Sequence, residues 1–370
     1  MSGMDKRNTA TIAENAALAK EKRGFPYKKV FFAFLIVLIV LSIFLLIINL
    51  VINSYFSKVK VFDGVWEVDT KKVYNMPIYR DNYAYFSQNE ELHAAYDAAL
   101  LNYAQATADM RYDEHVYNYA IFGVDQFDDS KVSRDPAADI IMLVSVNEES
   151  ERVTFLSFET RMLVYIPSVG VGPMSDAYVL GGPKLLSDTL EQNYGVQLDG
   201  FVELNMTAFS ELISVFGDIE ISGDGLLLKR INEDIALFNE AKGLDGKDAV
   251  KPAELRSGKI KLTGQQTLAY LRNAGEDKSA IANSVLSQLT GKIYEKGFGG
   301  IKTTLDIALE RMMVSMVRDD VGALIIIGTS VFENINTIPV GNKAGRDKVT
   351  VIGYTCNYRS ERETLVSNLY

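Results

Sequence analysis

The chain has 370 residues, 48% of them hydrophobic, and a net charge of −10. It is long enough to bury a sizeable core, but its acidic balance argues against nucleic-acid binding, which needs cations that neutralise phosphates. One cysteine excludes an internal disulfide, and two histidines argue against a His-rich zinc centre or a Ser-His-Asp triad, whereas carboxylate–Mg²⁺ chemistry stays open.

Residues 30–52 are an apolar run without a charge. As a helix the run would measure roughly 35 Å, enough to cross a hydrocarbon core of about 30 Å. No small-residue cleavage site follows it, so we expect a membrane anchor rather than a removed signal peptide. In residues 1–29 basic side chains outnumber acidic ones, and Lys28 and Lys29 abut the run. The positive-inside rule therefore predicts a single-pass plasma-membrane protein with a cytoplasmic basic tail (1–29) and residues 53–370 outside.

Residues 53–116 are predicted to form a juxtamembrane spacer packed against the main domain. Within it, Leu92, Tyr96 and Leu100 recur at helical spacing, which predicts a helix near 90–108. The spacer carries no recognisable chemistry. The low cysteine content fits an exported bacterial domain, because eukaryotic secreted domains of this size usually carry several disulfides.

The main domain is predicted to span 117–370 and to open with strands. The strand-like runs lie at 119–124, 140–146 and 153–158. A tight polar turn joins the second and third runs, so we expect a hairpin. Asp125 follows the first strand, Asp139 begins the second and Arg161 follows the third. If the first strand runs antiparallel to the second, both carboxylates and the cation converge at one edge of the sheet.

Further elements alternate along the rest of the chain, which predicts one α/β domain. Helices are expected from 181–183 onward and at 206–216, 263–272, 279–296 and 301–316; strands at 336–340 and 349–354; and a last helical turn from Ser360. Thr263 is the expected N-cap of the short helix, which ends at Arg272. The polar stretch 223–258 is interpreted as an insertion or mobile surface region.

Several of these stretches occur in the order found in one family. They are 118–125 (NYAIFGVD), the strand opened by Asp139, Leu156-Ser157, Ala177-Tyr178 with Gly181-Gly182, and 262–272 (LTGQQTLAYLR). Together with the N-terminal anchor they resemble the LytR-CpsA-Psr (LCP) family of bacterial cell-envelope proteins. The resemblance covers residues 117–370. It implies a central mixed sheet flanked by helices that enclose an apolar tunnel for a polyprenyl chain.

The resemblance also implies an activity. Family members are understood as Mg²⁺-dependent phosphotransferases that move teichoic acid or capsule from a polyprenyl pyrophosphate carrier to peptidoglycan in Gram-positive cell walls. Carried over to this sequence, Asp125 and Asp139 would hold the metal. Arg272, and Arg161 from the end of the third strand, would be the catalytic arginines that bind the phosphates.

The sequence departs from the family pattern where the family places cations. Arginine positions are occupied by Thr160, Ala137, Ala274, Ala280 and Asn283, and the family histidine by Asp176. Arg161 stands one residue late, where a strand would point it to the other face. Each lost charge-assisted contact is worth about 1.5–3 kcal/mol, so pyrophosphate binding should suffer.

Three hypotheses follow. The first is an LCP-type transferase with a rearranged cation set, in which Lys278 or Lys259 substitutes. The second is a catalytically impaired paralogue that binds ligand or regulates other LCP proteins in cell-wall assembly. The third, a glycosyltransferase or hydrolase, rests only on the acidic pairs Asp128-Asp129 and Asp319-Asp320. Purely structural roles also stay open: Asp125 and Asp139 could cap strand ends, and Arg272 could be a cation at a helix C-terminus.

Overall fold

The structure is a computed structural model. It describes residues 50, 53–54, 56–62, 67–124, 136–273, 278–309, 312–315, 335–340 and 346–370. The predicted cytoplasmic tail, nearly all of the predicted transmembrane run, and Asp125 lie outside these residues. Within them, no helix combines the length and apolarity that a membrane crossing requires. Residues Tyr55–Tyr370 form one compact unit, and this unit is described below.

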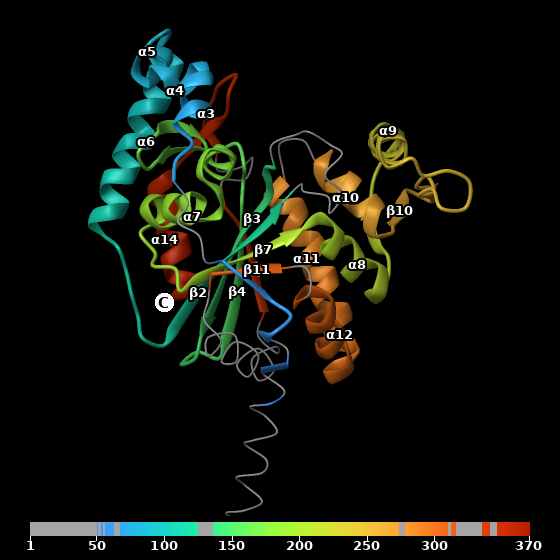
Figure 1. The fold of residues 1–370 in the computed structure, drawn as a ribbon. Coiled ribbons are helices and arrows are strands. Elements are labelled where there is room, and N and C mark those ends of the chain that lie inside the picture. The colour runs from blue at the N-terminus through green and yellow to red at the C-terminus, as the bar shows by residue number, and fades with distance from the viewer. Residues whose placement is uncertain are drawn as a thin grey trace, which may run out of the picture. The chain divides into compact units, whose positions relative to one another are not determined.

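A seven-stranded sheet forms the centre of the unit, in the order β1-β11-β7-β2-β3-β4-β12 (Figure 1). Its strands are β1 (Lys60–Val61), β2 (Val116–Val124), β3 (Ala138–Asn147), β4 (Arg152–Phe158), β7 (Gly200–Asn205), β11 (Met312–Val314) and β12 (Ile335–Val340). The pairs β2–β3, β3–β4 and β7–β11 are antiparallel, and β1–β11, β2–β7 and β4–β12 are parallel. The sheet is therefore mixed, as predicted, and the β3–β4 hairpin is confirmed.

Helices cover both faces of the sheet (Figure 1). On one face, α7 (Met174–Tyr194) and α14 (Tyr358–Leu369) contact the sheet, and α6 (Glu90–Ala108) packs against α7. On the other face, α8 (Met206–Phe216) and α11 (Lys278–Glu295) contact the sheet, and α10 (Gly264–Arg272) and α12 (Gly297–Leu309) pack against α8 and α11. The alternation of side chains along β3 explains the division. Ile141 and Leu143 are buried in the first core, whereas Ile140 packs against the second.

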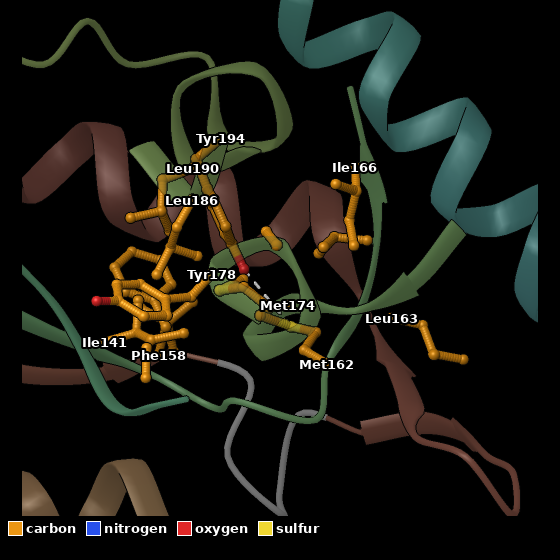
Figure 2. Packing of buried hydrophobic residues seen from close by; sticks show 14 of the residues in the cluster. Ile141, Phe158, Met162, Leu163, Ile166, Met174, Tyr178, Leu186, Leu190 and Tyr194 are labelled. Atoms are coloured by element: carbon orange, nitrogen blue, oxygen red, sulfur yellow. Dashed lines mark hydrogen bonds between the residues drawn. The ribbon is translucent and has the colours of Figure 1, made fainter. Parts of the chain in front are cut away.

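We call the first cluster the α7-side core. Figure 2 shows Ile141 and Phe158 of the sheet against Leu186 and Leu190 of α7. It also includes residues from the segment between β1 and β2, which contains the short helices α3 (Thr70–Asn75), α4 (Pro77–Arg80) and α5 (Asn82–Phe86). The side chains of Phe86, at the end of α5, and of Ala95 and Ala99, on α6, are fully buried in it. The helix predicted near 90–108 is confirmed, and this part of the predicted spacer contributes directly to the core.

The second cluster, the α10-side core, joins α8, α9 (Gly225–Lys242), α10 and α11 with a small sheet. That sheet has the order β8-β10-β9, made of β8 (Ile219–Ser222), β10 (Lys259–Leu262) and β9 (Leu255–Arg256). The core includes Leu212, Ile213, Ile231, Ile235, Ile260, Leu262, Ala269, Leu271, Val285 and Leu289.

Several predicted elements differ from the observed ones. The stretch 223–258 contains helix α9, in which Ile231 and Ile235 are buried, so it is not simply a mobile insertion. The described part of α12 extends to Leu309, and Met312–Val314, which were predicted as part of the same helix, instead pair with β7 as β11. Helix α7 begins before the predicted start, and Gly182 forms a kink inside it with a φ of 66°.

The remaining elements are local. The hairpins β5 (Leu163–Ile166)–β6 (Gly170–Pro173) and β13 (Arg346–Val349)–β14 (Tyr354–Cys356) lie outside the large sheet. The last helical turn predicted from Ser360 is the longer helix α14. Cys356 is buried in the α7-side core, as expected for a small core residue.

Candidate functional site

Three strand ends meet at the candidate site. In the β2–β3 pair Val124 lies opposite Ala138, and in the β3–β4 pair Ile141 lies opposite Phe158. The end of β2, the start of β3 and the end of β4 therefore lie at one end of the sheet (Figure 1). The predicted convergence is confirmed for the strands. Asp139 sits at this end, and Asp125, next after β2, lies outside the described residues.

The carboxylates at this end differ in exposure. Asp139 is half-buried, and Glu159, immediately after β4, is only 2% exposed. Both side chains take part in interactions with other groups. Within the described residues, no group of three or more His, Cys, Asp or Glu side chains is arranged to hold a metal ion.

Arg161 lies on the surface. Its Nη2 donates a hydrogen bond to the carbonyl of Val351 at 3.3 Å, and the side chain is exposed. Thr160, at the position where the resemblance implies an arginine, is buried, and its carbonyl accepts a hydrogen bond from the amide of Ser175 at 2.9 Å. β4 ends at Phe158, and Glu159 and Thr160 are both buried, so Arg161 is exposed from the turn after the strand and not through strand alternation.

Arg272 ends α10, whose start is fixed by a capping box between Thr263 and Gln266. The guanidinium is engaged in an ion pair that the sequence did not reveal. Its Nε and Nη2 donate to Oδ2 of Asp234, on α9, at 3.0 and 2.6 Å. The two side chains are 19% and 24% exposed. The partner was missed because α9 was interpreted as part of a mobile insertion; its N-cap, Asp224, and Gly243 at its end are the signals that mark it as a helix.

A second polar contact joins β4 to α11. The hydroxyl of Ser157 donates to Oδ1 of Asn283, and both side chains are more than nine-tenths buried. Among the residues that the structure describes, the Nδ2 of Asn283 has no hydrogen-bond partner. Asn283 occupies a position where the resemblance implies an arginine, so a neutral amide replaces a cation there.

Two of these polar residues border the α10-side core. Leu271, the neighbour of Arg272, is one of its buried members. Asn283, on α11, reaches the same face of the sheet through Ser157. Asp139 follows Ala138, which is buried in the α7-side core, and precedes Ile140, which packs against the α10-side core. Lys259, one of the proposed substitute cations, instead pairs with Glu220 on the small sheet and is exposed.

On the opposite face, two tyrosines donate to carboxylates. The hydroxyl of Tyr178 on α7 donates to Glu203 of β7 at 2.8 Å, and that of Tyr79 on α4 donates to Asp176 at 2.7 Å. Burial raises the pKa of both carboxyl groups, and the tyrosine hydrogen bonds lower it in part. Asp176 occupies the family's histidine position, and its partner Tyr79 could not be identified from the sequence.

Comparisons with known proteins show which family and fold the chain resembles. The model of the LytR_cpsA_psr family matches residues 82–282. The polyisoprenyl-teichoic acid–peptidoglycan teichoic acid transferase TagU of Enterococcus faecalis is 28% identical over 162 residues, which are 44% of this chain and 46% of that protein. The chain thus spans about half the length of the curated relatives it matches.

Solved structures support the same fold. Protein gbs0355 from Streptococcus agalactiae has a TM-score of 0.53 and 17% identity, and the match covers 69% of this chain and 88% of that one. A structure described as TagT bound to LI-WTA has a TM-score of 0.50 and 19% identity, with coverage of 70% and 93%. The mixed sheet with helices on both faces is therefore an architecture shared with these proteins.

Proposed function

The chain belongs to the LytR-CpsA-Psr family, and we propose that it binds a glycopolymer linked to a polyprenyl (pyro)phosphate and transfers it to peptidoglycan. The observation that carries the proposal is the family match over residues 82–282, together with the position of Asp139 at the shared end of β2, β3 and β4. A carboxylate for a metal ion and an arginine for phosphate oxygens are the groups that phosphoryl transfer uses. The name of the E. faecalis relative describes this kind of transfer.

The proposal includes Mg²⁺. Magnesium is usually held by one or two carboxylates together with substrate phosphates rather than by a complete protein cage. Asp139 fits this donor chemistry because it is a partly accessible carboxylate at the start of β3. We assign Asp125 as the second metal carboxylate. Bound there, the ion would neutralise charge on the phosphoryl group.

The proposal also includes the cell envelope. The apolar run 30–52 and the basic tail before it support a single membrane span, with the folded unit outside the cell. The expected partners are the polyprenyl-phosphate lipid, the anionic glycopolymer that it carries, peptidoglycan and other LCP proteins. A lipid-linked substrate stays in the membrane, so an anchored domain meets it without leaving the surface.

Native mass spectrometry of the full-length protein, extracted gently from its own membrane, tests ligand binding. We expect a co-purifying polyprenyl phosphate or pyrophosphate that is lost with EDTA and in Asp139→Asn. The exposed carboxylate Glu240, on α9, supplies the matched control Glu240→Gln, which should retain the lipid. Lipid-free wild-type protein, under conditions where an active relative keeps its lipid, would contradict the proposal.

A second candidate function, binding without transfer, is favoured by a specific observation. Arg272 is already ion-paired with Asp234, and the buried residues Thr160 and Asn283 are neutral where the resemblance implies arginines. A transfer assay with a purified lipid-linked donor and a peptidoglycan acceptor distinguishes the two functions. Polymer transferred by the wild-type chain and lost in Asp139→Asn establishes the transferase. Retained donor without transfer would identify a binding or regulatory protein.

A further inference from the structure

Helix α9 presents Asp234 to Arg272 from a fixed position. Ile231, Asp234 and Ile235 lie at i, i+3 and i+4, so they share one face of the helix. The two isoleucines are buried in the α10-side core. The Asp224 side chain caps the start of α9 by accepting from the amides of Leu226 and Leu227 at 3.0 and 2.8 Å. The carboxylate therefore belongs to a packed helix and not to a loose loop.

The next segment of the chain is tied to the same helix. Asn232 accepts from the amide of Ala253 at 2.7 Å and donates to its carbonyl at 3.1 Å. Asn239 makes the same pair of bonds with Val250, at 2.9 Å each. These bonds hold α9 in place on both sides of Asp234, so the ion pair with Arg272 is a built feature of the fold.

The ion pair changes what Arg272 offers to an anion. One carboxylate oxygen receives two N–H groups of the guanidinium, and both side chains are mostly removed from solvent. A charge-assisted contact of this kind is screened less than an exposed ion pair. A phosphate that approaches Arg272 is therefore attracted by the guanidinium and, from a few ångströms further away, repelled by Asp234.

We propose that Asp234 is a specificity-determining counter-ion, which lowers the affinity of Arg272 for strongly charged phosphate groups. This inference rests on the proposed function, which assigns Arg272 as a phosphate ligand. Asp234 lies on α9, outside the strand ends. By lowering the affinity of Arg272 for phosphate, it favours ligands that are held mainly by apolar and neutral polar contacts. An alternative role, in which Asp234 positions Arg272 for binding, predicts the opposite effect of removing its charge.

Isothermal titration of the purified full-length chain with inorganic pyrophosphate, in the presence of Mg²⁺, distinguishes the two roles. Asp234→Asn keeps an oxygen acceptor for the guanidinium but removes the negative charge. We expect it to bind pyrophosphate about tenfold more tightly than the wild type, as the loss of one nearby like charge implies. Asp234→Glu, which keeps the charge, should bind as the wild type does.

Two controls make the outcome specific. Glu233→Gln removes a charge from the next residue of α9, where the side chain is exposed and pairs with Lys229 at 3.7 Å, and should leave the affinity unchanged. In the Arg272→Gln background, Asp234→Asn should no longer tighten binding. Unchanged or weaker binding by Asp234→Asn overturns the counter-ion role. The single variant Arg272→Gln then separates this failure from that of the proposed function. If it binds pyrophosphate more weakly than the wild type, Arg272 is still a phosphate ligand; if it binds equally well, the proposed function fails too.

Discussion

Two buried amides on opposite faces of the central sheet differ in their hydrogen bonds. On the α7 side, Asn193 is fully buried, donates to the carbonyls of Tyr165 and Thr189 at 2.8 and 2.7 Å, and accepts from the amide of Tyr165 at 3.2 Å. On the α10 side, the amide nitrogen of Asn283 has no partner among the described residues, and Arg272 pairs with a carboxylate from another helix.

The difference indicates which buried polar side chains serve the fold and which are candidates for a role in function. A buried polar group with all its bonds made contributes rigidity, whereas a partly satisfied group is costly and is usually retained for a reason. Asn193 therefore fixes β5 to α7. Asn283, in contrast, is a neutral amide at a position where the resemblance implies an arginine.

The tightest helix contact on the α10 side should be the most sensitive position. A Cβ at Gly264 would lie 2.0 Å from the carbonyl oxygen of Ser210 on α8. Gly264→Ala must push α8 and α10 apart, and we expect it to lower the free energy of unfolding by about 3 kcal/mol. Urea denaturation measures this. Gly291→Ala in α11, where a Cβ meets nothing within 4 Å, should instead be neutral or slightly stabilising. Equal effects would contradict the close packing.

On the α7 side, Asn193→Ala should cost about 2 kcal/mol, because it leaves buried backbone groups of β5 and α7 without partners. The same urea titration gives the value. Gln197→Ala, a change at an exposed side chain just beyond α7, serves as the control and should have little effect. A loss for Asn193→Ala no larger than the control would mean that this face does not depend on its hydrogen bonds.

The Ser157–Asn283 contact can be isolated with a double-mutant cycle. Ser157→Ala and Asn283→Ala should each destabilise the protein, and their coupling should be about 1 kcal/mol, as for one buried hydrogen bond. Lipid retention measured on the same variants then tests the functional reading. If stability couples but lipid retention is unchanged in both variants, the pair on this face is purely structural.

The smallest effect concerns the pH dependence of stability. Because burial raises the pKa of Glu203, the folded chain holds this proton to higher pH than the unfolded chain. Between the unfolded pKa of about 4.3 and the raised folded value, the folded state binds more protons, so its stability falls as pH rises.

Glu203→Gln keeps an acceptor for Tyr178 and cannot ionise. Its melting temperature, relative to the wild type, should therefore increase from pH 4 to pH 7. The exposed control Glu240→Gln should show no such trend. A relative melting temperature that stays flat or falls for Glu203→Gln would contradict burial as the cause of the shift.

Local patterns in the sequence were sufficient for most of the fold around the site. Short apolar runs predicted β2, β3 and β4, and the tight turn predicted the β3–β4 hairpin, so Asp139 could be assigned to the shared strand end. The capping residues predicted α10 and therefore the position of Arg272. The predicted anchor and Asp125 lie outside the described residues and remain predictions.

Only the tertiary structure decided which side chains became partners. Asp234 meets Arg272, and Ser157 meets Asn283, from positions far apart in the chain. Residues 312–314 became a strand instead of the end of a helix because they pair with β7. Periodicity and caps reflect the geometry of one element at a time, whereas these contacts depend on how packed cores dock separate elements against each other. That docking determines whether an arginine at a family motif position meets a ligand or a carboxylate of its own chain.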